Sequence, residues 1–369
     1  MRVAVLGAAG TIAPAIVRDL ADSDEVDELL LLDIDEERAA AVAQARGGGK
    51  AGSARADARA APEAHGSLAG ALEGSDVLVN SASYRVNLDA MAACLRAGCH
   101  YLDLGGLYWM TELQLELDRQ FQREGLLGLL GMGSAPGKTN LMARMAAREL
   151  GEEIERVQVA AAGRDLDPPD GFSVPYALQT LLDEMTMQPV VLRSGSPQQI
   201  DPLTDGGVVD FGEPIGEAET IYTLHSELRT FGESFGCREA SFRLGLAPRL
   251  LAVLRDLTSA SDEEVNRKAT EALPPSAKTV SVHVVDASAN GRAVRVRAVT
   301  QPMERWALGG GIVSTATPAA AAVRLLARGA ITERGVLPPE SCVDPDALFA
   351  ELEPRGCRVE VRAVEEAIS

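Results

Sequence analysis

The stretch Val5–Ala21 reads VLGAAGTIAPAIVRDLA. An apolar run ends at Leu6, glycines stand at Gly7 and Gly10, and a helical pattern follows, which is the order strand, tight turn, helix. The form is G-x-x-G-x-x-A, with Ala13 where a small residue lets a helix approach a sheet closely. The N-terminal end of such a helix attracts a pyrophosphate. The stretch therefore predicts a dinucleotide-binding turn, with the pyrophosphate on the amides of residues 10–12.

An acidic residue ends the next apolar run, Leu29–Asp33. Asp33 lies about 20 residues past the glycine turn, where a carboxylate accepts the ribose hydroxyls and repels a 2′-phosphate. This favours NAD. Arg38 keeps NADP open, because a guanidinium just beyond the second strand can pair with a 2′-phosphate. The alternative interpretation of Asp33 is a solvated acid at a strand end.

Short apolar runs alternate with helical stretches from Met1 to about Leu150. This alternation is typical of strand–helix–strand units in a parallel sheet, so we expect an α/β fold that begins with a Rossmann domain. The expected strands are Val3–Leu6, Leu29–Asp33, Ala54–Asp57, Val77–Asn80, Tyr101–Leu104 and Leu126–Leu130.

Polar and small residues follow the third and fourth expected strands. Asp57 and Ala58 fall where an adenine edge is usually met, and Asn80, Ser81 and Ala82 fall at the crevice where strand order reverses. The alternative for Asn80 and Ser81 is ordinary turn chemistry. The complete expected cofactor set is Gly7, Ala9, Gly10, Thr11, Ile12, Asp33, Ile34, Asp57, Ala58, Asn80, Ser81 and Ala82.

The turn after the sixth expected strand, Gly131–Asn140, reads GMGSAPGKTN. It resembles a nucleotide triphosphate loop, but that loop needs a glycine separated by four residues from Gly137. Met132 stands there instead. We interpret the stretch as a turn that opens toward a second domain, with a helix N-terminus suited to a nicotinamide carboxamide or a substrate carboxylate. Lys138 is then a candidate anion contact, or only a solvated lysine.

The alternation of strands and helices ends after Gly151. From there, proline-rich loops separate strand-like segments, which predicts a mixed α+β domain. Two alternating runs around Asn290-Gly291 predict an antiparallel hairpin. Later, Thr317 as N-cap, Pro318 at the first helical position and Gly329 as a stop predict a helix that returns to the first domain. The expected boundaries are 1–137 for the Rossmann domain, 138–311 for a substrate and dimerisation domain, and 312–369 for the returning segment.

The second domain contains its densest polar cluster in IYTLHSELRTFGESF. His225, Glu227 and Arg229 alternate there, so on a strand their side chains would share one face. A group that titrates near neutrality, a carboxylate and a guanidinium suit an amino acid substrate. Tyr176 and Glu184 are possible amine or ammonium contacts. The alternatives are an exposed strand face for the cluster and a solvated helix for the other pair.

Composition limits the class of protein. The 369 residues are 46% apolar, enough for two domains, and the net charge is 35 − 54 = −19, which disfavours nucleic acid and anionic membranes. The five cysteines are scattered and show no metal-ligand spacing with the four histidines. We therefore expect no metal, reduced thiols and a cytoplasmic protein. A secretory signal at the N-terminus is the disfavoured alternative, and His65, His100 and His283 are expected to be structural or surface residues.

The chain resembles the saccharopine dehydrogenase-like oxidoreductases, and among them the lysine 6-dehydrogenase type. The resemblance covers nearly the whole chain and rests on VLGAAGTIAPAIVRDLA, DIDEERA, DVLVNSAS, AGCHYLDLGG, GSAPGKTNLMA, TIYTLHSELRT and GVLPPESCVDPDALFAEL. It implies a Rossmann domain, a mixed-sheet substrate and dimerisation domain with C-terminal helices returning, a homodimer, and reversible NAD(P)-linked chemistry at a C–N bond of an amino acid or polyamine-like compound. By position, it assigns the phosphate turn to Gly7, Gly10, Thr11 and Ile12 and the substrate-facing turn to Ser134–Asn140.

The resemblance is imperfect at that turn. Saccharopine-forming members carry an acid before the Pro-Gly and a histidine soon after it, where this chain has Ala135 and Asn140, and Lys138 replaces the usual apolar residue. The expected catalytic residues are His225, Glu184 and Lys138, and the expected substrate contacts are Tyr176, Glu227, Arg229 and Asn140.

Three other functions are weighed against a lysine-type dehydrogenase. A carboxynorspermidine- or saccharopine-type reductase, which forms a secondary amine, stays open. So does a non-catalytic dinucleotide sensor. A short-chain alcohol dehydrogenase is disfavoured, because no tyrosine of the chain is followed by lysine four residues later.

Overall fold

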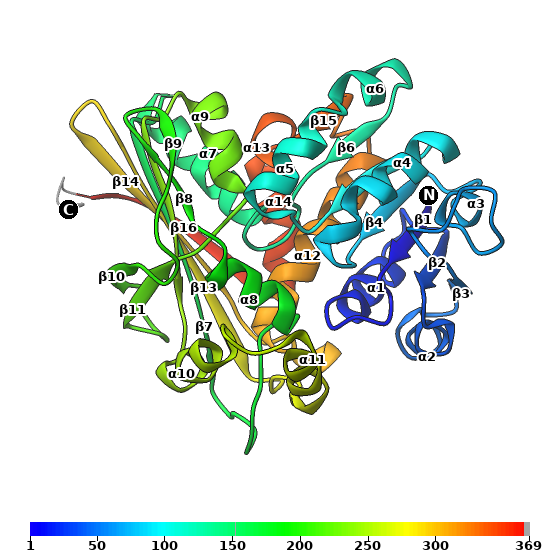
Figure 1. The fold of residues 1–369 in the computed structure, drawn as a ribbon. Helices are drawn as coiled ribbons and strands as arrows, with labels where there is room; N and C mark the ends of the chain where they lie inside the picture. Colours follow the sequence, from blue (N-terminus) through cyan, green and yellow to red (C-terminus); the bar gives the residue numbers. More distant parts are fainter. Residues whose placement is uncertain (152, 365–369) are drawn as a thin grey trace. The chain divides into compact units, whose positions relative to one another are not determined.

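The computed structural model describes residues 1–151 and 153–364 (Figure 1). They divide into two compact units. Unit 1 comprises Met1–Lys138 and Thr315–Glu351, and unit 2 comprises Thr139–Ser314 and the chain from Leu352 onward. Each unit contains one main sheet, and each is described by itself.

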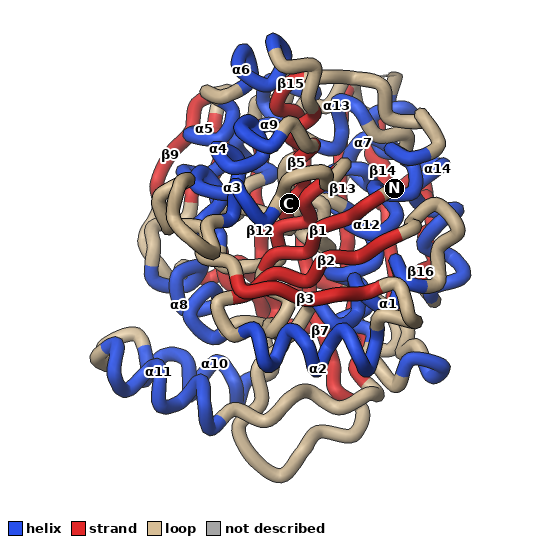
Figure 2. The backbone as a smooth tube through the Cα atoms, turned by 90° about the vertical axis from the view of Figure 1, so that its right-hand side faces the viewer, coloured by secondary structure: helices blue, strands red, loops and turns tan. Residues whose placement is uncertain are grey.

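Unit 1 is built on a parallel sheet. Within the described residues its strands pair in the order β15 (Gly335–Leu337), β6 (Leu127–Leu129), β5 (His100–Asp103), β4 (Val77–Asn80), β1 (Arg2–Leu6), β2 (Glu28–Asp33) and β3 (Ala51–Arg55). Figure 2 shows β1, β2 and β3 side by side. The order reverses between β1 and β4, which is the doubly wound Rossmann arrangement.

The expected strands of this domain are confirmed to within a few residues. The third strand needs a correction, because β3 ends at Arg55 and Asp57 lies in the following turn. The reason is the pairing of β3 with β2, which ends at the pair Asp33 and Arg55. The seventh strand, β15, was not predicted, since its three residues carry too little pattern to be recognised.

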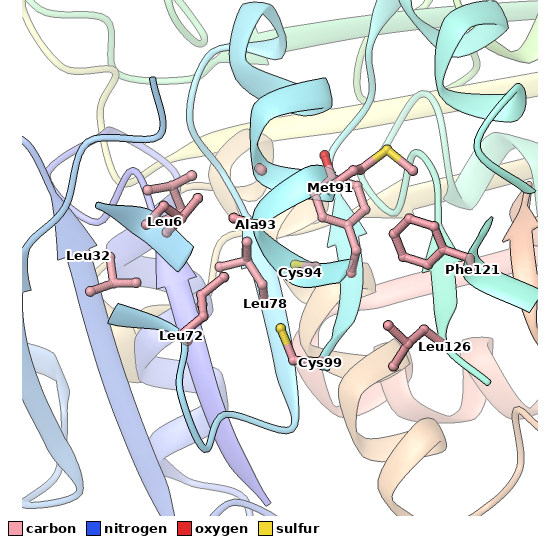
Figure 3. Close-up of a cluster of buried hydrophobic side chains, with 14 of the residues drawn as sticks. Leu6, Leu32, Leu72, Leu78, Met91, Ala93, Cys94, Cys99, Phe121 and Leu126 are labelled. Carbon is pink, nitrogen blue, oxygen red and sulfur yellow. The ribbon is translucent and has the colours of Figure 1, made fainter. Parts of the chain in front are cut away.

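Helices cover this sheet and enclose an apolar core. They are α1 (Ala13–Ala21), α2 (Glu36–Arg46), α3 (Leu68–Ala71), α4 (Asn87–Ala97), α5 (Leu107–Leu115) and α6 (Asp118–Arg123). Figure 3 shows part of the core, in which Leu78, Met91 and Phe121 are fully buried. Burial of such side chains stabilises the unit by about 1.5–3 kcal/mol each.

The C-terminal helices return to unit 1, as expected. They are α12 (Gly310–Ala327), α13 (Pro339–Cys342) and α14 (Pro345–Leu352), drawn orange to red in Figure 1. Arg324 of α12 donates to Asp19 of α1 (3.0 Å) and to Glu351 of α14 (2.6 Å), and its side chain is only 2% exposed. A buried guanidinium needs such carboxylate partners, and this ion network links α12 to α1 and α14.

Unit 2 is built on a mixed sheet. Its strands pair in the order β10 (Asp205–Asp210), β11 (Glu217–Tyr222), β12 (Glu239–Gly245), β7 (Arg156–Asp165), β13 (Thr279–Ala289), β14 (Arg292–Thr300) and β16 (Cys357–Val364), and β8 (Val190–Arg193) and β9 (Ser196–Gln199) branch from β12. Strands β13 and β14 form the expected hairpin around Asn290 and Gly291, which both have positive φ. The helices of this unit are α7 (Lys138–Leu150), α8 (Leu178–Thr186), α9 (Glu227–Phe235), α10 (Pro248–Leu257) and α11 (Asp262–Glu271).

The expected returning segment, residues 312–369, is corrected in its last part. Strand β16 pairs antiparallel with β14, from Thr300 opposite Cys357 to Ala293 opposite Val364, so it belongs to unit 2. The alternating side chains of β16 fit an edge strand. Its pairing partner β14 is distant in the sequence, so the local pattern could not predict this pairing. The boundaries at 137/138 and 311/312 otherwise stay predictions.

Helix α12 also starts earlier than expected. Thr317 and Pro318 lie inside it rather than at its N-terminus, and Val313 already donates to the carbonyl of Gly309. Pro318 cannot donate the helical hydrogen bond, which costs about 3 kcal/mol or more. Burial of the apolar side chains of Val313, Ala316 and their neighbours offsets this cost. It ends at Ala327, and Gly329 follows with a φ of 70°. By length and composition α12 is apolar enough to cross a membrane, but 83% of that window is buried inside the protein.

Candidate functional site

The glycine turn after β1 is packed directly against the turn after β4. The amides of Gly7 and Ala8 donate to the carbonyl of Leu32 at 2.9 and 3.2 Å. A Cβ on Gly7 would lie 2.6 Å from the amide nitrogen of Ala82, and Gly7 has a φ of 78°. Only glycine fits such a position without strain. The backbone of residues 7 and 82 is therefore close enough to form one continuous floor.

Helix α1 starts beyond this floor. Its N-cap is Ile12, which supplies no side-chain hydrogen bond, and Pro14 stands in its first turn. The amides at the start of a helix without a side-chain cap suit a phosphate. The positions of Gly10, Thr11 and Ile12 thus fit the pyrophosphate of a dinucleotide, as the spacing predicts.

Asp33 at the end of β2 fixes the neighbouring backbone. Its carboxylate accepts from the amide of Ala9 (2.9 Å) and from the amide of Asp35 (3.0 Å). Each carboxylate oxygen has a second lone pair that a ribose hydroxyl can use. Arg38 donates to the carbonyl of Ala9 at 3.1 Å, so a cation lies beside the same turn. Ile34 is 66% exposed next to it, an apolar surface suited to a base.

The turn after β4 is shaped by Asn80. Its side chain is 1% exposed, donates to Asn87 (2.9 Å) and Tyr101 (3.2 Å), and accepts from the amide of Ala82 (3.1 Å). Ser81 donates to the carbonyl of Leu6 at 2.8 Å. These contacts show turn chemistry at both residues, and their expected contact with a cofactor stays a prediction. Asp57 likewise accepts from the amide of Arg59 in a turn, with Ala58 between them.

The stretch GMGSAPGKTN forms a closed turn between β6 and α7. The amide of Gly131 donates to the Asp103 side chain (2.6 Å), and the amide of Lys138 donates to the carbonyl of Gly133 (3.0 Å). A Cβ on Gly137 would lie 2.5 Å from the Gly133 carbonyl oxygen. The glycines are needed for this tight packing, and amides that bind protein oxygens do not wrap a triphosphate. Lys138 is fully buried.

Unit 2 contains a buried acid–base cluster. Nδ1 of His225 lies 2.8 Å from a carboxylate oxygen of Glu227, and Thr139 donates to the other oxygen of Glu227 at 2.8 Å. The imidazole stacks on Phe242, with 3.4 Å between the ring centroids and 13° between the planes. Among the described residues, no hydrogen bond forms to Nε2 of His225. The cluster therefore holds one ring nitrogen and leaves the other available.

A second carboxylate belongs to this cluster. Glu184 of α8 accepts from the hydroxyl of Tyr176 at 2.5 Å. Burial raises the pKa of Glu184, whereas the charge of His225 and the hydrogen bond from Tyr176 oppose that shift. Burial would lower the pKa of His225, but the charge and hydrogen bond of Glu227 and the charge of Glu184 raise it overall. The imidazole is thus biased toward its protonated form.

The strand predicted for this stretch is wrong. Strand β11 ends at Tyr222, and Glu227 begins helix α9, so Arg229 does not share a strand face with His225. The physical reason is the helical spacing of Leu228, Phe231 and Phe235, all buried. Arg229 instead contacts Glu233 one turn later at 2.8 Å.

The structure brings together four of the expected residues, namely Tyr176, Glu184, His225 and Glu227. It adds Thr139 and Phe242, which the sequence did not identify. Thr139 belongs to the Gly-Lys-Thr stretch of the sequence. Because that stretch does not fit a triphosphate loop, its threonine could have been considered for another role. Asn140, on the first turn of α7, is 2% exposed. Among the side chains that the structure describes, no group of three or more His, Cys, Asp or Glu residues could hold a metal ion.

Unit 1, with its strand order, glycine turn and carboxylate after β2, is a dinucleotide-binding domain of the Rossmann class. Residues 3–129 match the sequence model of the family described as saccharopine dehydrogenase NADP binding domain. This part of the chain is therefore similar to the domain of that family, and the dinucleotide that the chain uses is NAD(P).

Two curated relatives match part of the chain. A carboxynorspermidine synthase of Vibrio alginolyticus is 24% identical over 49% of this chain and 47% of that protein. A carboxyaminopropylagmatine dehydrogenase of Synechocystis sp. is 27% identical over 42% of this chain and 40% of that protein. The matches span less than half the length of these relatives.

One solved structure shares the whole fold. The apo saccharopine dehydrogenase (L-Glu forming) from Saccharomyces cerevisiae has a TM-score of 0.71 at 14% identity, with 98% of this chain and 99% of that chain covered. This likeness confirms the combination of a Rossmann-like domain with a second, mixed-sheet domain.

Proposed function

We propose that this protein is an NAD(P)-dependent oxidoreductase that transfers hydride at the C–N bond of an amine or imine. The proposal is supported by the dinucleotide-binding family of unit 1 and by the names of the relatives, which include two dehydrogenases and a synthase of carboxylated amines. The observation that carries it is the His225–Glu227 pair, because it leaves one imidazole nitrogen available for proton transfer.

The reaction requires two transfers. NAD(P)H, when bound, supplies a hydride to the carbon of a C=N bond, and the nitrogen must gain a proton. His225 holds a proton because Glu227 stabilises the imidazolium, and Nε2 can donate it. In the oxidative direction the neutral imidazole accepts a proton from the amine nitrogen. Phe242 stacks on the ring, and Thr139 donates to the Glu227 carboxylate that binds the ring.

The charges of the cluster favour an amine substrate. Glu184 and its neighbour Asp183 are both less than 9% exposed, and one oxygen of Glu184 accepts no hydrogen bond from the described residues. A substrate ammonium can use that oxygen. We therefore propose a substrate with a free amino group, such as lysine or a related diamine. We also propose Lys138 as a catalytic residue, and Asn140 and Arg229 as substrate contacts.

The test measures turnover with both cofactors in both directions. We expect NAD(P)H oxidation with an aldehyde or keto acid plus a diamine, or NAD(P)⁺ reduction with lysine, at a rate well above that of a protein-free control. Absence of turnover across this panel, with dinucleotide binding intact, would contradict the proposal and favour the non-catalytic sensor.

The preference between NAD and NADP tests the β2 turn. We expect Arg38→Ala to weaken NADPH binding about 10-fold and NADH binding less than 2-fold, because a guanidinium–phosphate pair contributes about 1.5–3 kcal/mol. Asp33→Asn should strengthen NADPH binding relative to NADH binding, because it removes the repulsion between the carboxylate and the 2′-phosphate. Titration of each variant with both dinucleotides measures the change, and Arg59→Ala, an exposed arginine in the turn after β3, is the control. Equal loss for both dinucleotides in Arg38→Ala would show that the arginine only shapes the turn.

We also propose a homodimer in the cytoplasm. The resemblance to the family supports the dimer, and the five buried, free cysteines fit a reducing compartment. Sedimentation of the purified protein at several concentrations tests the dimer, and a single monomer boundary would contradict it.

A further inference from the structure

A buried carboxylate outside the expected cofactor set lies at the centre of the β4–β5–β6 half of unit 1. Asp103 ends β5 and is 1% exposed. One oxygen accepts from the amides of Gly131 (2.6 Å) and Gly105 (2.9 Å). The other accepts from Gln114 (2.7 Å), Tyr101 (2.9 Å) and, at 3.2 Å, from Asn87.

These contacts connect the ends of three neighbouring strands. Gly105 follows β5 and Gly131 follows β6. The link to β4 runs through Asn87 and Asn80, because Asn80 donates to Asn87 and accepts from the amide of Ala82. One carboxylate thus links the turns that follow β5 and β6 directly and the turn that follows β4 through Asn87 and Asn80. These turns leave the carboxyl edge of this half-sheet, which is the edge at which Rossmann domains bind ligands.

The network requires a group that only accepts hydrogen bonds. In the observed arrangement five N–H or O–H groups point at the two oxygens, and an ionised carboxylate, which only accepts hydrogen bonds, satisfies all five donors. Burial raises the pKa of Asp103, while the hydrogen bonds from Gln114, Gly131, Tyr101 and Gly105 oppose that shift. An asparagine would place an NH₂ group against these donors, which leaves buried polar groups unpaired.

A Rossmann domain consists of two mononucleotide-binding halves. The adenosine half includes the turns after β1 and β2, which contain Gly7 and Asp33. The other half, strands β4 to β6, would hold the nicotinamide mononucleotide. Among the described residues, every hydrogen-bond donor to the Asp103 carboxylate belongs to the other half, and none is a residue expected to bind the adenosine half.

We propose that Asp103 is the positioning residue for the nicotinamide half of the dinucleotide. It orders the loops at Ala82, Gly105 and Gly131 before the cofactor binds, and so lowers the ordering cost of binding. This inference rests on NAD(P) use by unit 1 and is independent of the substrate. It predicts that loss of the Asp103 charge affects ligands that contain nicotinamide and spares those that contain only the adenosine half.

The test compares a whole dinucleotide with its adenosine half. Asp103→Asn is expected to weaken NADPH binding about 10- to 100-fold, from the loss of charge-assisted hydrogen bonds. Binding of 2′-phospho-ADP-ribose should change less than about 2-fold, within the scatter of single contacts. NADH and ADP-ribose replace this pair if the wild type prefers NAD. The fluorescence of bound NADPH, which reports the surroundings of the nicotinamide, should shift toward that of free NADPH.

Two further variants keep the test decisive. Tyr101→Phe removes one hydrogen-bond donor to Asp103 and retains the buried ring. It replaces Asp103→Asn as the test if that variant does not fold. We expect it to weaken NADPH binding about 3- to 10-fold. Asp89→Asn, the same change at an exposed position of α4, should have no effect. Equal loss of both ligands, or loss of neither, would overturn the role of Asp103. Failure of the wild type to bind any dinucleotide would instead overturn the cofactor assignment itself.

Discussion

Replacement of His225 by glutamine is expected to lower kcat about 10²- to 10⁴-fold, the usual contribution of a general acid or base. One ring nitrogen of His225 is hydrogen-bonded to Glu227 and the ring stacks on Phe242, so the imidazole is held in one orientation. Glutamine retains a similar volume and a polar end but transfers no proton at neutral pH. Single-turnover kinetics with NAD(P)H measures the loss, and His65→Gln, at an exposed histidine, is the matched control.

The proposed role of His225 also predicts the direction in which kcat/KM changes with pH. In the reductive direction the active form is the imidazolium, so kcat/KM is constant at low pH and falls as the pH rises through the elevated pKa of His225. Glu227→Gln removes the charge that stabilises the imidazolium, so the fall should move to lower pH. His225→Gln should abolish this limb of the profile. An unchanged profile in both variants would exclude His225 as the proton donor.

Replacement of Gly7 by alanine is expected to abolish measurable dinucleotide binding and to lower the free energy of unfolding by about 2–5 kcal/mol, the sum of the left-handed backbone cost and overpacking. Its Cβ would lie 2.6 Å from the amide nitrogen of Ala82 and 2.9 Å from the carbonyl carbon of Ser81. Those are backbone atoms, which cannot move aside as a flexible side chain does. The turn after β1 and the turn after β4 must therefore move apart.

Gly98→Ala is the matched control for that variant. Gly98 also has a positive φ, 71°, but a Cβ there would meet no atom within 4 Å. It should lose only the backbone cost, about 1–2 kcal/mol, and retain dinucleotide binding. Urea denaturation and dinucleotide titration of both variants separate the two contributions. If the two alanine variants behave alike, the close approach of the two turns has no role in binding.

The Rossmann domain was predictable because its signals are local. Leu6, Gly7 and Gly10 report strand, turn and helix within a few residues, and Asp33 follows at the expected distance. Apolar runs covered on both faces identify parallel strands without knowledge of their partners. The hairpin at Asn290-Gly291 was predictable for the same reason, since its turn residues are adjacent in sequence.

The cluster in unit 2 was only partly predictable. Alternating polar residues at 225, 227 and 229 satisfy a strand pattern, but the buried positions Leu228, Phe231 and Phe235 satisfy a helical one. Packing resolved the ambiguity in favour of the helix. As a result Glu227 contacts His225, whereas Arg229 contacts Glu233.

Sequence alone was sufficient for the class of fold, the glycine turn, the acid after β2 and the presence of a histidine with acidic neighbours, because each is encoded within a short segment. The tertiary structure was needed to pair Thr139 with Glu227, to place Phe242 on His225, to gather five donors on Asp103 and to add β15 and β16 to their sheets. Except for the donors Tyr101 and Gly105, which lie two residues from Asp103, these contacts join residues that are more distant in the chain. Burial makes them obligatory, since a polar group removed from water must find a partner, but which partner it finds depends on the packing of the whole unit.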